Sequence, residues 1–213
     1  MIKLILFDYD GVIVDSFQNV YEVYSTICKK LGKKFPEGID EFKKIYGNSS
    51  SECYNQLGFS EEERIKGNII FKEEILKKNP SVFKGIPGLL EELHRTYKLV
   101  LLSSSYREEV EQKLTRFGIM RFFDHIIAKE NHIRRFEKTE PITSLLKKLG
   151  LRKEEALLIG DRNIDFIEGA KAGLKNILLV DYGWGYDPEP IPEYKPRSII
   201  KKPEDILTAV KKY

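Results

Sequence analysis

The sequence is poor in cysteine and contains no long apolar run. The chain of 213 residues has two cysteines, Cys28 and Cys53, and neither belongs to a C-x-x-C pair, so no disulfide framework is predicted. No window approaches the roughly 18 consecutive apolar residues of a membrane-spanning helix. Asp8 and Asp10 interrupt the N-terminal apolar run, which does not fit a signal peptide. These absences predict a protein of a reducing compartment, and we expect it in the cytoplasm without a membrane partner.

Charge of one sign is not concentrated anywhere in the chain. The 36 basic and 33 acidic residues give a net charge of +3, and they are spread along the sequence without a block of like charges. A nucleic-acid-binding surface is therefore not predicted. A hydrophobic content of 41% together with 32% charged residues predicts a globular protein, long enough for one large domain or for a core with a smaller companion.

The N-terminal segment combines a mostly apolar run with an acidic turn. The run from Ile2 to Phe7 predicts a buried parallel strand, which stops at Asp8 and Asp10 before Gly11 breaks the pattern. A strand that ends in this way places both carboxylates at the carboxyl edge of a sheet, where ligands bind in open α/β proteins. Carboxylates beside an apolar core are costly unless a divalent cation compensates their charge. The alternative is a common acidic turn before a helix.

Residues 16–84 carry a helical pattern. Apolar side chains recur at helical spacing from 17 to 31, and Gly32 ends this predicted helix. Ser60 and Glu63 form a capping-box signature before another helix. The predicted helices after the first span residues 39–46, 50–57 and 61–78. No strand is predicted between 17 and 83, so this segment is interpreted as a helical insertion.

From residue 85 onward, helices and strands alternate. Helices are predicted at 88–96, 106–117, 140–149, 164–172 and 204–211, and strands at 98–102, 125–128, 156–159, 176–180 and 198–200. Such alternation with apolar strands predicts a parallel sheet covered by helices on both faces. The predicted fold class is therefore α/β, a doubly wound parallel sheet with an inserted α-helical cap. We assign residues 1–15 and 85–213 to the core domain and residues 16–84 to the cap domain.

Further polar residues follow the predicted strands at the same edge of the sheet. They are Ser103 and Ser104 after the strand at 98–102, Lys138 after the strand at 125–128, and Asp161 and Asp165 after the strand at 156–159. The carboxyl ends of parallel strands meet at one edge, so these side chains are expected to converge with the first acidic pair. A nucleophile, a cation held by carboxylates and donors for phosphoryl oxygens are the parts that phosphoryl transfer requires.

Each of these groups also has a purely local interpretation. Ser105 is a candidate cap for the helix at 106, and Asp161 or Asn163 for the helix at 164. Lys138 is one of many lysines, and Pro141 can start the helix that follows it. Their occurrence together, in order and at one edge, favours the functional interpretation over the local ones.

Four motifs in this order resemble those of the haloacid dehalogenase-like hydrolase superfamily. The segment Asp8-Tyr9-Asp10-Gly11-Val12-Ile13-Val14-Asp15-Ser16 resembles its first motif. Ser103 resembles the second motif, Lys138-Thr139-Glu140-Pro141 the third, and Gly160-Asp161 with Asp165 the fourth. The resemblance covers the whole core and is strongest to the branch of phosphoglycolate phosphatases and β-phosphoglucomutases.

The resemblance implies a role for each residue. Asp8 would attack phosphorus and form an aspartyl-phosphate, and Asp10 would act as acid and then base. Mg²⁺ would be held by the Asp8 carboxylate, the Asp10 carbonyl and Asp161, with Asp165 as a further or outer contact. The phosphoryl oxygens would contact Ser103, the backbone of Ser104 and Lys138. Each of these roles is assigned only to a residue that matches one of the four motifs.

The presence of Asp10 favours a phosphatase over two related activities. Dehalogenases and phosphonatases of the superfamily lack an acid at this position, and a halide needs no proton when it leaves. The β-phosphoglucomutases carry His and Arg at the positions that correspond to Val20 and Ser50. A Mg²⁺-dependent phosphatase acting on a small phosphorylated metabolite is therefore favoured, with a mutase or a dehalogenase-type hydrolase as the alternative. A monomer or a homodimer is expected.

Two further segments leave their roles open. The loop at 47–51 resembles the substrate-specificity loop of the family's cap, and it also fits a plain turn before a helix. Arg134 and Arg135 either contact an anionic substrate or are solvated. Several aromatic residues either line a cleft or pack against one another, and these are Tyr9, Phe17, Tyr21 and Tyr24.

Overall fold

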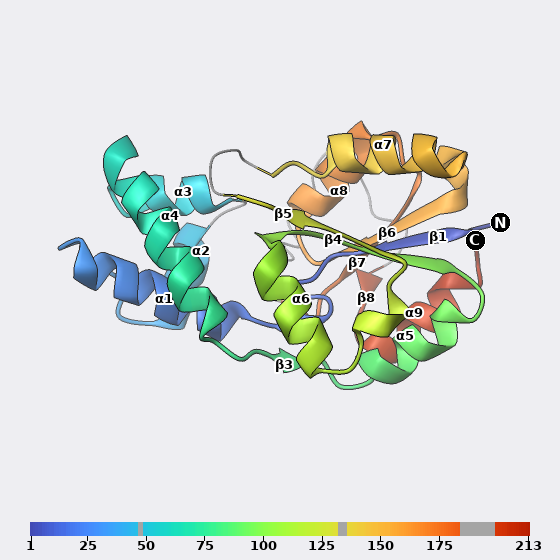
Figure 1. Ribbon diagram of the computed structural model, residues 1–213, viewed down its shortest axis with the longest axis horizontal. Helices are drawn as coiled ribbons and strands as arrows, with labels where there is room; N and C mark the ends of the chain where they lie inside the picture. The colour runs from blue at the N-terminus through green and yellow to red at the C-terminus, as the bar shows by residue number, and fades with distance from the viewer. Residues whose placement is uncertain (47–48, 132–135, 184–198) are drawn as a thin grey trace. The chain divides into compact units, whose positions relative to one another are not determined.

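The computed structural model describes residues 1–46, 49–131, 136–183 and 199–213 (Figure 1). Within these ranges the chain forms two compact units, which are described separately. One unit contains Met1–Asp15, Ser81–Glu130 and the described residues after 135, and the other contains Ser16–Pro80 and Asn131. The described part of the chain has no helix long and apolar enough to cross a bilayer.

The first unit is built on a parallel sheet of six strands in the order β5-β4-β1-β6-β7-β8. The strands are β1 (Leu4–Phe7), β4 (Lys98–Tyr106), β5 (His125–Lys129), β6 (Ala156–Gly160), β7 (Asn176–Val180) and β8 (Ile199–Ile200). The first strand of the chain, β1, is central in the sheet, with β4 on one side and β6 on the other. The strand order reverses at β1, so the carboxyl ends of β1, β4 and β6 meet at the point where ligands bind in open α/β sheets.

Helices cover both faces of this sheet, which confirms the predicted doubly wound architecture. The helices are α5 (Ile86–His94), α6 (Arg107–Arg116), α7 (Thr139–Leu149), α8 (Asn163–Lys171) and α9 (Pro203–Val210). Alternate residues of β1 define the faces: Ile5 and Phe7 belong to the cluster with α5, α6 and α9, whereas Leu4 and Leu6 belong to the cluster with α7 and α8. Figure 1 shows α7 and α8 on one side of the sheet and α5, α6 and α9 on the other.

The second unit contains four helices among its described residues. They are α1 (Phe17–Lys30), α2 (Ile39–Tyr46), α3 (Ser50–Gln56) and α4 (Glu61–Leu76). Phe42 is fully buried, and the rings of Tyr24 and Phe35 lie 5.4 and 5.2 Å from its ring centre. The rings of Phe17 and Tyr21 also contact Phe42, so these aromatic residues pack against one another within the unit. At the start of α4, Ser60 and Glu63 form the predicted capping box.

The structure corrects several of the predicted boundaries. A two-residue strand, β3 (Ser81–Val82), pairs antiparallel with β2 (Val14–Asp15), so the prediction of no strand between 17 and 83 is wrong. Such a short ribbon lacks the length from which a periodic pattern can be recognised. The strand at 98–102 continues to Tyr106, with an irregular register after Leu102. Two short 3₁₀ helices, Met120–Phe122 and Lys153–Glu155, were not predicted either.

The burial of the strands predicts that substitutions at core positions lower stability more than substitutions at exposed positions of the sheet edge. Leu158 in β6 is fully buried in the α7 and α8 cluster, and shortening it to alanine leaves a cavity. We expect Leu158→Ala to lower the free energy of unfolding by about 2–5 kcal/mol. Urea denaturation followed by circular dichroism measures this loss. Ile199→Ala, at a position 43% exposed, is the matched control and should cost under about 1 kcal/mol; equal losses would contradict the assignment of the core.

Candidate active site

The first acidic residue stands where β1 ends and a tight loop begins. The Asp8 backbone N–H donates to the Ile159 carbonyl, which continues the pairing of β1 with β6 by one residue. The chain then turns back, because the carbonyl of Tyr9 accepts hydrogen bonds from the N–H groups of both Ile13 and Val14. Gly11 lies in this turn with φ +75°, a left-handed conformation that glycine adopts without strain. This turn keeps the residues that follow Asp8 at the same edge of the sheet as Asp8 itself.

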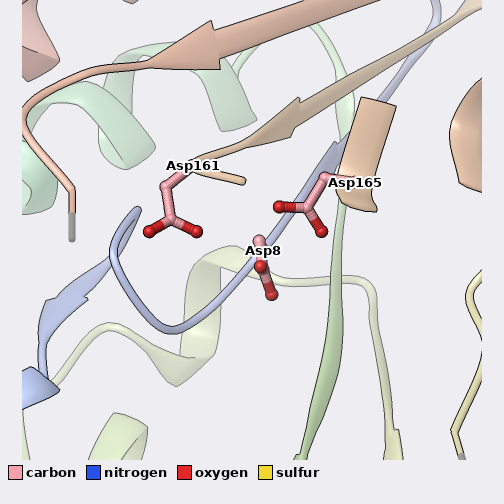
Figure 2. Close-up of side chains that lie close together, drawn as sticks. All are labelled: Asp8, Asp161 and Asp165. Atoms are coloured by element: carbon pink, nitrogen blue, oxygen red, sulfur yellow. The ribbon is translucent and has the colours of Figure 1, made fainter. Parts of the chain in front are cut away.

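Three buried carboxylates converge at this edge. Asp8 follows β1, Asp161 follows β6 and Asp165 lies in the first turn of α8, and one oxygen of each lies within 4.8 Å of the others (Figure 2). The three residues are 6%, 1% and 1% exposed, respectively. Carboxylates held so close together repel one another and are poorly solvated. A nearby cation would neutralise their charge and stabilise the arrangement. The prediction that these three side chains meet is confirmed as geometry.

A buried lysine provides part of the missing positive charge. Lys138 precedes α7, is 5% exposed, and places its Nζ 2.9 Å from Asp8 Oδ2 and 2.6 Å from Asp165 Oδ1. Its backbone N–H donates to Glu168 Oε2 at 2.6 Å, so α8 fixes the lysine through two separate carboxylates. Burial alone would lower the pKa of Lys138, but Asp165 and Asp8 outweigh it and raise the pKa above its usual value. The ammonium group is therefore charged at neutral pH.

The three carboxyl groups differ in how well their charge is compensated. Burial raises the pKa of Asp8 to about 7, although Lys138 acts in the opposite direction. Burial, with the charges of Asp165 and Asp8, also raises the pKa of Asp161. For Asp165, burial is outweighed by Lys138 and Arg162, and its pKa lies below its usual value. Asp165 is therefore the carboxyl whose charge the lysine compensates best, whereas burial raises the pKa of Asp8 and Asp161 more than nearby positive charge lowers it.

Both oxygens of Asp165 already accept hydrogen bonds. Oδ1 accepts from Lys138 Nζ, and Oδ2 accepts from the backbone N–H of Arg162 at 3.0 Å. Arg162 is the residue before α8, so Asp165 satisfies a donor that the helix start leaves unpaired. Neither Asp161 nor Asn163 is the residue at the cap position of α8, so the local interpretation of these two residues as its cap is wrong.

Glycines make room for the cluster. A Cβ on Gly11 would lie 1.9 Å from Asp161 Oδ2, and one on Gly160 would lie 2.4 Å from Asp165 Cβ. A Cβ on Gly183 would lie 2.4 Å from the Gly11 carbonyl oxygen. Any residue with a Cβ at these three positions would overlap its neighbours. The glycines therefore allow the backbone to lie directly against the carboxylates and the Gly11 loop.

The three serines near the end of β4, Ser103 to Ser105, have different environments. Ser103 is fully buried, and its Oγ accepts a hydrogen bond from the Ser105 N–H at 3.0 Å. Ser104 is exposed. Ser105 donates its hydroxyl to Asp10 Oδ2 at 2.6 Å. The residue before α6 is Tyr106, so the local interpretation of Ser105 as a helix cap is wrong.

Asp10 lies outside the group of three carboxylates. Among the described residues, the cluster that could hold a metal consists of Asp8, Asp161 and Asp165. The family resemblance implies a metal contact for the main-chain carbonyl of Asp10, not for its side chain, and this contact stays a prediction. The Asp10 carboxylate instead accepts the hydroxyl of Ser105.

Sequence reasoning missed three contributors to this site. Ser105 and Glu168 bond to predicted site residues, and Gly183 lies against the Gly11 loop. No sequence signal marks a glutamate in mid-helix as the partner of a lysine 30 positions earlier. Arg134, Arg135 and residues 47–48 of the loop at 47–51 lie outside the described residues.

The fold and this site define a known class of enzyme. The sequence model of the haloacid dehalogenase-like hydrolases matches residues 5–179, and the chain belongs to this family. The family match confirms the resemblance that the four motifs carry.

Individual relatives cover nearly the whole chain. Pyrophosphatase PpaX from Oceanobacillus iheyensis is 26% identical over 214 residues, which span 98% of this chain and 97% of that protein. The phosphoglycolate phosphatase from Aquifex aeolicus is 28% identical over 192 residues, or 86% of each chain. The solved structure of a haloacid dehalogenase-like family hydrolase from Streptococcus pneumoniae has a TM-score of 0.83 at 24% identity and covers 98% of both chains. This structural likeness supports the fold.

The close approach at Gly160 predicts a steric effect. We expect Gly160→Ala to lower the free energy of unfolding by about 1–3 kcal/mol, because the new methyl group overlaps the Asp165 side chain. Thermal unfolding of the purified protein measures the change. Gly88→Ala is the matched control: a Cβ there meets no atom within 4 Å, and alanine in α5 should be neutral or stabilising by up to about 1 kcal/mol. A Gly160→Ala variant as stable as Gly88→Ala would contradict the packing described.

Proposed function

We propose that the protein is a Mg²⁺-dependent phosphatase that hydrolyses a small phosphate monoester through an aspartyl-phosphate on Asp8. The observation that carries this proposal is the position of the Asp8 carboxylate: its Oδ2 lies 2.9 Å from the Nζ of a buried lysine, and one of its oxygens lies within 4.8 Å of two further buried carboxylates. A carboxylate nucleophile must approach a phosphate dianion, so positive charge beside it is the first requirement. Membership in a hydrolase family and relatives that are named phosphatases support the same conclusion.

The residues present fit a divalent cation. The oxygen-only donor set of Asp8 and Asp161 suits Mg²⁺. Burial raises the pKa of both carboxyls, and a bound cation would lower them again. When bound, Mg²⁺ would supply charge neutralisation at the nucleophile and at the phosphoryl oxygens. Asp165 is better placed as an outer contact, because both of its oxygens already accept hydrogen bonds.

The chain's own residues account for each bond that changes. An oxygen of Asp8 attacks phosphorus, the bond from phosphorus to the ester oxygen breaks, and the leaving alcohol takes a proton from Asp10. Asp10 then removes a proton from water, the water oxygen bonds to phosphorus, and the bond to Asp8 breaks to release inorganic phosphate. Ser103 and the Ser104 N–H would donate to phosphoryl oxygens, and Lys138 contacts nucleophile and phosphate together.

A small phosphorylated metabolite is the proposed substrate, and a monomer or homodimer the proposed form. Phosphoglycolate and pyrophosphate are the first compounds to test, because relatives carry the corresponding names. Asp10 supports a leaving group that needs a proton, which disfavours dehalogenation. Val20 is buried in α1, and its apolar side chain cannot replace the catalytic His of the mutase branch.

The proposed chemistry predicts the behaviour of two single substitutions. We expect wild-type protein to release phosphate from at least one member of a panel of phosphoglycolate, pyrophosphate, sugar phosphates and nucleoside monophosphates, and only with Mg²⁺. Asp8→Asn should lose activity by at least about 1,000-fold, since no covalent intermediate can form, and Asp10→Asn by about 100- to 10,000-fold. Steady-state phosphate release measures both effects.

The control for these substitutions is Asp205→Asn, which changes a carboxylate in the first turn of α9 and should leave the rate unchanged. Absence of release from every compound, with wild type equal to Asp8→Asn, would rule out the phosphatase proposal.

The raised pKa of Asp8 predicts that Mg²⁺ affinity depends on pH. Asp8 must be ionised to bind the cation, and its pKa of about 7 means that it takes up a proton as the pH falls through neutrality. We expect the Mg²⁺ dissociation constant to rise about tenfold or more between pH values of about 8 and 6, with proton release on binding near neutral pH. Calorimetric titration with MgCl₂ measures both quantities. Asp8→Asn should bind weakly and with a smaller pH dependence, and equal wild-type affinity at both pH values would contradict the prediction.

A further inference from the structure

Ser105 joins two parts of the site that the sequence presents as separate motifs. Its backbone N–H donates to Ser103 Oγ at 3.0 Å, and its side-chain hydroxyl donates to Asp10 Oδ2 at 2.6 Å. Ser103 and Asp10 are the proposed phosphate-binding hydroxyl and the proposed acid. One residue therefore contacts both, from a position 95 residues away from Asp10 in the chain.

The end of β4 explains why Ser105 can make both contacts. The pairing of β4 with β5 is regular up to Leu102, shifts register, and resumes with Tyr106 opposite Lys129. The irregularity spans residues 103–105, so the Ser105 N–H bonds to a side chain instead of the neighbouring strand. Irregular pairing of this kind re-aims side chains beside functional sites. Here it directs the Ser105 hydroxyl to the carboxylate of Asp10.

We propose that Ser105 is a positioning residue for Asp10, which it holds in one orientation with Oδ2 occupied as an acceptor. This inference rests on the proposed function, in which Asp10 protonates the leaving alcohol. Because the serine hydroxyl donates to Oδ2, the proton that Asp10 transfers is carried on its other oxygen, Oδ1. The serine does not contact the reacting atoms; it decides which oxygen of the acid faces the leaving group.

The consequence is a dependence on the leaving group. An alkyl phosphate has a basic leaving oxygen and needs the proton from a correctly oriented Asp10, whereas p-nitrophenyl phosphate leaves as a stable phenolate and needs it far less. Loss of the serine hydroxyl should therefore slow the alkyl ester selectively. A purely structural role would lower both rates together, because it changes the amount of competent enzyme and not the choice of leaving group.

The test compares kcat/KM for the best alkyl phosphate of the panel with kcat/KM for p-nitrophenyl phosphate. The variants are Ser105→Ala, which removes the hydroxyl, and Ser105→Thr, which keeps it. Thr96→Ala, which removes an exposed hydroxyl in the same unit, is the matched control. The ratio of the two kcat/KM values is independent of the fraction of folded protein, so a partly unstable variant still gives a valid result.

We expect Ser105→Ala to lower the alkyl value by about tenfold or more and the aryl value by less than about threefold, and Ser105→Thr to restore the ratio. A Ser105→Ala ratio equal to that of Thr96→Ala would overturn the inference, as would an equal change of the ratio in both Ser105 variants. Asp10→Asn, measured in the same assay, separates the two proposals. If Asp10→Asn leaves the alkyl rate unchanged, the proposed role of Asp10 fails; if only Ser105→Ala is without effect, the positioning role alone fails.

Discussion

The rest of the site depends on the ion pairs that the buried ammonium group of Lys138 forms with Asp8 and Asp165. Three carboxylates lie together at 1–6% exposure, an arrangement that would not stay charged without nearby positive charge. Lys138 contacts two of them directly and is itself fixed by Glu168 through its backbone. The pKa shifts follow from these contacts: the pKa of Asp165 is lowered, chiefly by Lys138, whereas burial keeps those of Asp8 and Asp161 raised. The shortage of positive charge beside Asp8 and Asp161 supports the proposed binding of a cation at this site.

The same edge depends on the absence of side chains. Gly11, Gly160 and Gly183 each stand where a Cβ would overlap a carboxylate side chain or the carbonyl of a neighbouring loop. The β1 loop therefore lies against Asp161, and the end of β6 against Asp165, with no room left for a Cβ between them. Compactness of this kind also explains why the carboxylates are so poorly solvated. The close packing that the glycines permit is thus also the cause of the raised pKa values of Asp8 and Asp161.

The site separates two kinds of carboxylate. Asp8, Asp161 and Asp165 share the charge of the lysine, while Asp10, two residues after Asp8, turns to a serine hydroxyl from β4. Asp8 at the strand end and Asp10 in the following loop therefore have different surroundings, as their proposed roles of nucleophile and acid require.

The sequence alone determined the α/β class, the parallel sheet and most of its helices, because buried strands and amphipathic helices leave periodic patterns. It also determined that Asp8, Ser103, Lys138, Asp161 and Asp165 belong to one edge, since residues after parallel strands meet there. It did not determine that Asp165 uses both oxygens within the protein, that Glu168 fixes Lys138, or that Ser105 bonds to Asp10. Apart from the local bond that Asp165 accepts from the Arg162 N–H, those contacts join residues 27–95 positions apart. They depend on an irregular strand end and on glycine clearances, which follow from packing between elements and leave no local periodicity.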